Sequence, residues 1–173
     1  MGPRGAAHAI DGWIGSASHN WGSAHTDAYA WGQVMGFDGA PGSFLECITG
    51  DVKVAGLAVP RSTLAVLHHE GRSFAFTNPV VGMLARARYE VGAWTFRCEG
   101  RDAVIDARFH APPSAFLGLR YRNPPGGTKI CHNSKIARAD VTLIERGGRV
   151  TTLTSDRAAF EILLDEPRVP LAV

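Results

Sequence analysis

The sequence lacks a charge imbalance, a long apolar run and an obvious pairing of cysteines. Its 18 basic and 16 acidic side chains leave a net charge of +2, and no cluster of Lys and Arg suggests nucleic-acid binding. No apolar run approaches the roughly 20 residues that cross a bilayer, and the N-terminus lacks the apolar segment of a signal peptide. Cys47, Cys98 and Cys131 are odd in number and far apart, which favours neither a disulfide framework nor a zinc site. We therefore expect a cytoplasmic protein without a membrane span, a nucleic-acid partner or a metal.

The length and composition are those of one globular unit. A chain of 173 residues suits a single domain covering residues 1–173. Hydrophobic residues make up 45% and charged residues 20%, so the chain has enough apolar surface for a sizeable core.

Short segments rich in β-branched or aromatic residues, each ended by Gly, Pro, Asn or Asp, predict an all-β protein. Alternation is clearest at 85–91, where two alanines and a tyrosine oppose two arginines and a glutamate, and at 94–100, where Trp94, Phe96 and Cys98 share one face. The expected strands lie at 9–19, 28–37, 43–49, 52–59, 62–69, 72–77, 83–90, 93–99, 102–109, 115–122, 128–132, 135–146 and 149–154.

Two segments of this pattern carry particular expectations. Pro60 is expected to separate two strands. The segment 155–164, SDRAAFEILL, fits either a short helix capped by Ser155 or a last strand. Many sequential antiparallel strands favour a lipocalin-like antiparallel β-barrel holding one ligand, with a two-sheet sandwich as the alternative.

The stretch SASHNWGSAHTDAYAWGQV, residues 16–34, gathers indoles, imidazoles and amides with a single carboxylate. As a strand it places Tyr29, Trp31 and Gln33 on one face, while the opposite face carries only small side chains and a valine. Large rings with polar tips suit a ligand-filled barrel interior, although Trp31 and Tyr29 are equally consistent with ordinary core packing. The small face predicts the close approach of a neighbouring layer.

Two carboxylates are expected to point inward, Glu46 and Asp106. Glu46 shares its face with Phe44 and Ile48, where a charge is costly unless it is paired. It is therefore either a reactive acid or half of a buried salt bridge with a strand arginine. The consecutive Cys131, His132 and Asn133 point alternately in a strand, which disfavours a thiol nucleophile set, and the histidines have no metal-ligand spacing.

Four segments carry a resemblance to a known family. The stretch 16–34 resembles the His-Asn-Trp-Gly segment of the tocopherol cyclase and carotenoid 1,2-hydratase superfamily, which includes the AttH-like proteins. FLECITGDVKVAG, WTFRCEGRDAVIDARF and CHNSKIARADVTL resemble later segments of the same domain, in the same order. The resemblance covers about residues 10–165 and falls on the second, C-terminal half of a family whose members typically have two lipocalin-like halves.

This resemblance implies a cyclase- or hydratase-type enzyme, an isomerase or lyase that includes the pericyclic cyclases, without a cofactor. Its substrate would be a hydrophobic polyene, prenyl quinol or polyketide of terpenoid or other secondary metabolism, held in an aromatic-lined pocket. The alternatives are a non-catalytic carrier of a hydrophobic ligand and an interaction subunit that completes a partner's half-barrel. A homodimer or a second lipocalin-like half would replace the missing half.

Cyclisation or hydration of an alkene needs an acid aimed at a double bond and aromatic walls that stabilise the developing cation. The catalytic residues are accordingly expected to be His19, Asn20 and Glu46. The ligand-binding residues are expected to be Trp21, Tyr29, Trp31, Gln33, Trp94, Phe96, His132 and Asn133.

Overall fold

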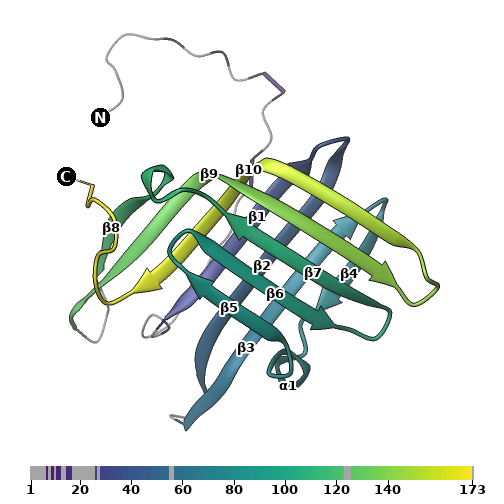
Figure 1. Cartoon of the computed structure of the whole chain (residues 1–173), viewed down its shortest axis with the longest axis horizontal. Helices are drawn as coiled ribbons and strands as arrows, with labels where there is room; N and C mark the ends of the chain where they lie inside the picture. The colour runs from purple at the N-terminus through teal and green to yellow at the C-terminus, as the bar shows by residue number, and fades with distance from the viewer. Residues whose placement is uncertain are drawn as a thin grey trace.

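The computed structural model describes three segments, residues 28–54, 57–122 and 126–172, with seven isolated positions before them, Ala7, Ala9, Asp11, Gly12, Gly15, Ser16 and Thr26. Ten strands make up most of the described chain and there is almost no helix, which confirms the all-β class (Figure 1). They are β1 (Tyr29–Phe37), β2 (Ala40–Val54), β3 (Leu57–His69), β4 (Arg72–Phe76), β5 (Arg86–Glu90), β6 (Ala93–Glu99), β7 (Ala103–His110), β8 (Leu117–Arg122), β9 (Thr128–Glu145) and β10 (Val150–Leu164).

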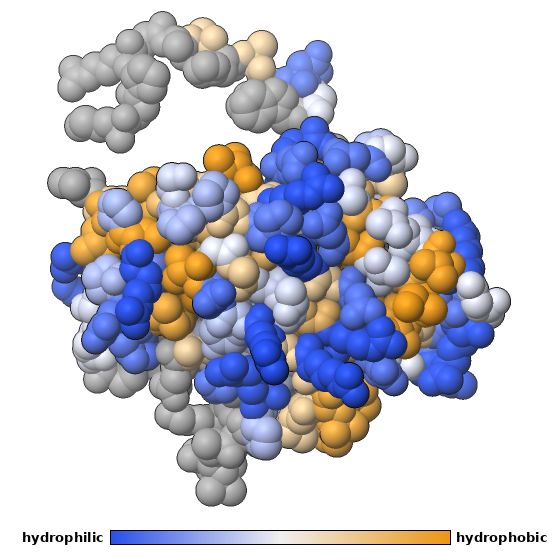
Figure 2. All heavy atoms as spheres, viewed as in Figure 1, coloured by the Kyte–Doolittle hydropathy of each residue, from blue (hydrophilic) through white to orange (hydrophobic). Residues whose placement is uncertain are grey.

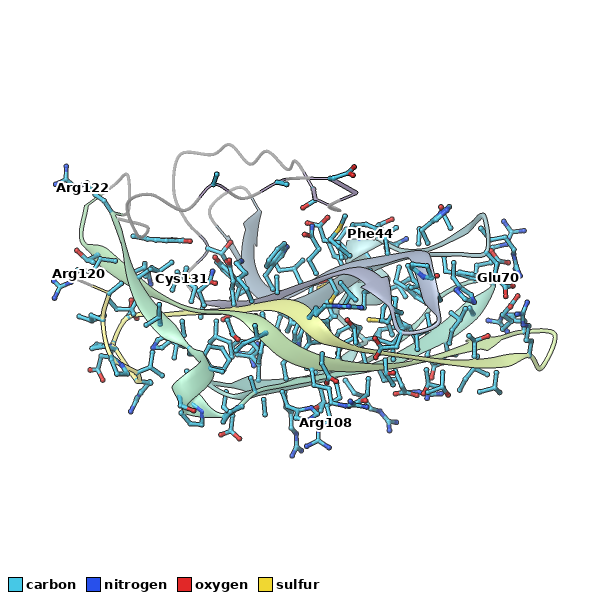
Figure 3. The ribbon with its side chains drawn as sticks, turned by 90° about the horizontal axis from the view of Figure 1, so that it is seen from above. Phe44, Glu70, Arg108, Arg120, Arg122 and Cys131 are labelled. Carbon is cyan, nitrogen blue, oxygen red and sulfur yellow. The ribbon has the colours of Figure 1, made fainter. Side chains whose placement is uncertain are left out.

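The strands form one antiparallel sheet in the order β4-β3-β2-β1-β10-β9-β7-β6-β5, and β8 pairs with the first part of β9. Within the described residues the end strands β4 and β5 do not pair, so the sheet is open and the expected barrel closure is not confirmed. Two register shifts in β10, at Ser155/Ala158 and Ala158/Phe160, mark bulges of the kind that bend a strand. The sheet curls until β6 and β7 face β1 and β2, as the two layers of Figure 3 show.

The space between the two layers is filled by a cluster of aromatic side chains. Trp94 lies at its centre, with ring centroids 4.9 Å from Phe96, 5.2 Å from Phe109 and 6.2 Å from Phe160. The indole N–H of Trp94 donates to Thr49 Oγ1 at 3.1 Å, so the one polar atom of this buried ring is satisfied. The interior is therefore packed core, and its aromatic rings contact one another.

Several strands are longer than the sequence pattern predicts. The expected strands at 128–132 and 135–146 form the single strand β9 (Thr128–Glu145). Strand β10 continues through 155–164, so the strand interpretation of that segment is confirmed. Pro60 lies inside β3 and does not separate two strands, contrary to expectation. The register shift between Gly50 and Val52 of the paired strand β2 provides the irregular position that a proline needs within a sheet. The described helices are only α1 (Pro79–Gly82) and a single 3₁₀ turn (Pro113–Ala115).

The loops at one end of the sheet are tied together by ion pairs. Arg72 binds Glu145, and Arg149 Nη1 lies 2.9 Å from Glu70 Oε2, so the β3–β4 turn is joined to the β9–β10 turn. No helix in the described part of the chain has the length and apolarity of a membrane span.

Candidate functional site

The two faces of β1 have the opposite roles to those expected. Ala30, Gly32 and Val34 are buried against the core, and a Cβ on Gly32 would lie 2.7 Å from Phe109 Cε1. This confirms the predicted close approach of a neighbouring layer to the small face. The large side chains Tyr29 and Trp31 lie on the other face, which we call the outer face of the sheet, rather than inside it.

Part of the aromatic and amide stretch falls outside the described residues, including His19, Asn20 and Trp21. Their predicted roles stay predictions. Ser16, just before them, donates its hydroxyl proton to Gln33 Oε1 at 2.8 Å, so this described position of the N-terminal region lies against the outer face of β1.

A groove of about 430 Å³ runs along the outer face of β1, β2 and β3. Trp31 Nε1 donates to Glu46 Oε1 at 3.2 Å, and this is the one hydrogen bond of the half-buried Glu46 side chain within the described structure. Among the described residues Glu46 makes no ion pair with an arginine, so the expected alternative of a buried salt bridge is not observed. The groove is lined by Trp31, Phe44, Glu46, Cys47, Ile48, Leu64, Ala65, Val66 and Thr77.

A second carboxylate, Glu161 of β10, lies directly opposite Trp31 across the β1–β10 pair. Its side chain is 15% exposed and accepts hydrogen bonds from the amide of Asn133, from Lys135 Nζ at 3.0 Å and from the Cys131 thiol at 3.6 Å. Lys135 Nζ also lies 5.6 Å from the centre of the Trp31 ring, a cation–π distance. Trp31 thus stands between the groove and the surroundings of Glu161.

These side chains form one group, which we call the outer-face cluster: Tyr29, Trp31, Gln33, Glu46, Cys131, Asn133, Lys135 and Glu161. In Figure 3, Phe44 from the groove and Cys131 from the cluster lie on the same side of the molecule. Arg108 of β7, in the other layer, points outward on the opposite side. The structure therefore brings together five of the predicted site residues, Tyr29, Trp31, Gln33, Glu46 and Asn133.

Burial keeps the titratable donors of the cluster protonated. Desolvation and, as the second cause, the nearby Glu161 carboxylate together raise the pKa of the Cys131 thiol to about 12. Desolvation also raises the pKa of the Tyr29 hydroxyl, and that of the Tyr121 hydroxyl of β8 beside Cys131, well above the usual range of a phenol. At neutral pH these groups are hydrogen-bond donors, and Cys131 is not a thiolate nucleophile.

The remaining predicted residues lie elsewhere. Trp94 and Phe96 are buried in the core on the far side of β1 from Trp31. His132 is fully buried between two backbone partners: Nδ1 donates to the Ile162 carbonyl at 3.0 Å, and Nε2 accepts from the Arg168 amide at 2.9 Å. Burial lowers the pKa of His132, which agrees with a neutral imidazole in this one tautomer.

Asp106 does not point inward as expected. Its side chain is 43% exposed and binds Arg97, because Ile105 and Phe109 occupy the inward positions of β7. No group of three or more His, Cys, Asp or Glu side chains suited to a metal occurs among the described residues.

Sequence reasoning missed Glu161, Lys135 and Tyr121. The alternation of residues 155–164 indicates the position of Glu161. If this segment is a strand, Glu161 must lie on the face opposite to the apolar Phe160 and Ile162. Lys135 adjoins the bulged part of the β9–β10 pair, where no simple alternation fixes the direction of a side chain.

Comparison with known proteins finds similarity to an uncharacterized protein of Mycobacterium tuberculosis, Rv0493c in strain ATCC 25618 / H37Rv and MT0513 in strain CDC 1551 / Oshkosh. Each is 31% identical to this chain over 150 residues, which is 82% of this chain and 41% of the relative. The chain thus spans about two fifths of the length of the curated relatives it matches. No protein-family model matches the chain, and no solved structure matches it significantly. The resemblance to the tocopherol cyclase and carotenoid 1,2-hydratase superfamily stays a prediction.

Proposed function

We propose that the outer-face cluster is the active site of a cyclase- or hydratase-type enzyme, an isomerase or lyase acting on a hydrophobic polyene, prenyl quinol or polyketide. The observation that carries the proposal is the half-buried Glu46 carboxyl, held by the Trp31 indole beside a groove with apolar walls. A carboxyl group next to an apolar groove can be aimed at a double bond that has no polar group of its own.

Glu46 suits proton transfer better than Glu161 does. Glu161 accepts hydrogen bonds from three side chains, including a lysine, and its role in the proposal is to position Asn133 and Lys135. Glu46 accepts one hydrogen bond in the described structure and has a further oxygen that can carry or take a proton. The face of the Trp31 ring would stabilise a developing cation.

The reaction keeps its atoms in balance without a cofactor. A protonated acid gives its proton to one carbon of the alkene. The resulting cation is captured either by another double bond or hydroxyl of the same molecule, which closes a ring, or by water, which gives an alcohol. Capture by a hydroxyl or by water releases an O–H proton, whereas capture by a double bond moves the cation to another carbon, which then loses a proton from a neighbouring carbon. In each case the released proton returns to the carboxylate. His19, beside Asn20 and Trp21, is the second acid or base in the proposal.

The test is turnover of candidate polyenes, quinols and polyketides by the purified chain. Products are separated by liquid chromatography, and their masses are measured by mass spectrometry. An isomer of equal mass or an adduct of one water is expected. Glu46→Gln and His19→Ala should each lower the rate by about 10²–10⁴-fold, the typical contribution of a positioned acid or base. Asn20→Ala should lower activity through misorientation, and Trp21→Ala should weaken binding as well.

Glu90→Gln is the matched control, because Glu90 is an exposed strand carboxylate on β5, in the opposite layer. It should retain the wild-type rate. A Glu46→Gln enzyme that works as fast as wild type would contradict the acid–base assignment. Binding without any turnover, with only affinity changes in the variants, would favour the carrier.

The alternative of an interaction subunit is supported by one observation: the aligned part of the relatives is only 41% of their length. In this alternative a homodimer or a second lipocalin-like half covers the outer-face cluster. Light scattering of the purified chain should then give twice the mass of one chain or show a bound partner. A lone chain at every concentration would contradict it.

A further inference from the structure

The exposed apolar side chains of the described chain are concentrated in one short segment. Val80, Val81 and Leu84 are 64%, 41% and 81% exposed, and all three lie within five residues of one another at α1. The other large exposed apolar residues, Leu117, Ile136 and Val150, are single and lie on three different strands. Single exposed apolar residues are ordinary on protein surfaces, whereas a cluster requires an explanation.

This segment, residues 79–84, is tied to its neighbours with Val80, Val81 and Leu84 exposed, and we call it the apolar knob. Asn78 Oδ1 accepts hydrogen bonds from the backbone N–H groups of Val80 at 3.0 Å and Val81 at 3.2 Å. A Cβ on Gly82 would lie 2.4 Å from Ser62 Oγ, so the segment lies directly against β3. The knob therefore cannot turn Val80, Val81 and Leu84 inward without losing this contact.

Cationic side chains without carboxylate partners follow the knob. Arg86 and Arg88 of β5 are exposed, and neither makes an ion pair within the described structure, whereas their neighbour Arg97 binds Asp106 and Glu99. Figure 2 shows the apolar surface at the position of α1 beside the hydrophilic surface of β5 and β6. An apolar tip with adjacent arginines is the surface composition of a protein that binds anionic lipid.

We propose that the apolar knob docks on the surface of an anionic lipid bilayer, with Val80, Val81 and Leu84 entering the interface and Arg86 and Arg88 facing lipid phosphates. A second copy of the chain fits less well. A two-fold interface would bring the patch against itself and place arginines opposite arginines. Three side chains are also far fewer than the roughly 20–30 residues a side of a stable protein interface.

The test is sedimentation of the full chain with vesicles of phosphatidylcholine alone and of phosphatidylcholine mixed with phosphatidylserine. Binding is expected on the anionic vesicles and should weaken at high salt. Leu84→Asp should lower binding at least tenfold, because it removes the apolar tip. Arg86→Gln and Arg88→Gln should each lower it about fivefold. Leu84 is so exposed that circular dichroism should show unchanged folding in the variant.

Ile136→Asp is the matched control, a single exposed apolar residue at 68%, and should bind vesicles like wild type. The proposal is overturned if the wild type sediments with neither vesicle, if Ile136→Asp loses as much binding as Leu84→Asp, or if neutral vesicles bind equally and the arginine variants are unaffected. It is also overturned if Leu84→Asp instead abolishes a dimer or the binding of an acidic protein while vesicles bind nothing.

Discussion

A hydrogen atom in place of a side chain at Gly32 lets β1 lie against the aromatic core. A Cβ there would come within 3.0 Å of Phe109 and Trp94, both fully buried. Gly32→Ala should therefore overpack the core and lower the free energy of unfolding by about 1–3 kcal/mol. Urea denaturation followed by tryptophan fluorescence measures this.

Gly42→Ala is the control for Gly32→Ala. Gly42 also lies in a strand, β2, but nothing is within 4 Å of a Cβ placed on it. Its substitution should change stability by less than about 1 kcal/mol. Equal stabilities of the two variants would contradict the close packing of β1 on β7.

The buried thiols and phenols make stability depend on alkaline pH. Burial raises the pKa of Cys98 and Cys131 to about 12 and that of Cys47, Tyr29 and Tyr121 above their usual ranges. An unfolded chain releases thiol protons near pH 8.5 and phenol protons near pH 10, so above pH 8.5 it binds fewer protons than the native chain. Stability is therefore full below pH 8.5 and falls as pH rises.

Each thiol should contribute a loss of up to about 1.4 kcal/mol per pH unit between pH 8.5 and its folded pKa. Urea unfolding at pH 7 to 10.5 measures how steeply the free energy of unfolding falls with pH. Cys131→Ala should reduce that slope by the contribution of one thiol. Native thiols should also resist alkylation at pH 8. Constant stability up to pH 10.5, or fast alkylation at pH 8, would contradict the burial of these groups.

At the scale of elements, His132 of β9 fixes the segment that follows β10. It joins the Ile162 carbonyl to the Arg168 amide, and beyond it Gly118 exchanges hydrogen bonds with Pro170 and Ala172. His132→Ala should cost about 1–3 kcal/mol, because it leaves buried backbone groups unpaired. Hydrogen exchange should speed up at residues 165–172.

The same residue gives a prediction for acid pH. The folded pKa of His132 is lowered, so as pH falls below about 6.5 the unfolded chain takes up a proton before the native chain does. Stability is therefore present above pH 6.5 and lost below it, and His132→Ala should reduce this loss. An acid slope as steep in His132→Ala as in the wild type would contradict this assignment.

The strands were predictable from the sequence wherever one face of the strand is buried in the core and the other is exposed to solvent. In β5 and β6 the alternation assigns Tyr89, Trp94 and Phe96 inward, and the structure agrees. The predicted strand boundaries were wrong where the alternation is interrupted. The register shift beside Pro60 and the bulges of β10 let one strand continue where the sequence pattern predicts a break. Composition also could not tell which face of β1 is inside, because that depends on the distant Phe109 and Trp94 filling the interior.

At the scale of the whole molecule, the sheet curls around a filled interior and leaves its polar and aromatic cluster outside. Sequence alone could not reveal that Glu46 of β2 and Glu161 of β10 flank one indole, because only the strand pairing of the folded sheet brings them to Trp31. We propose that a hydrophobic ligand binds this outer face and not the packed interior.

The most direct test is titration of the protein with cis-parinaric acid, a polyene whose fluorescence rises on binding. We predict saturable binding that weakens about tenfold or more in Trp31→Ala, since an aromatic wall of the groove is lost. Phe96→Leu, a change within the packed interior, should bind the probe like wild type. Loss of binding in Phe96→Leu with full binding in Trp31→Ala, or no saturable binding at all, would contradict ligand binding at the outer face.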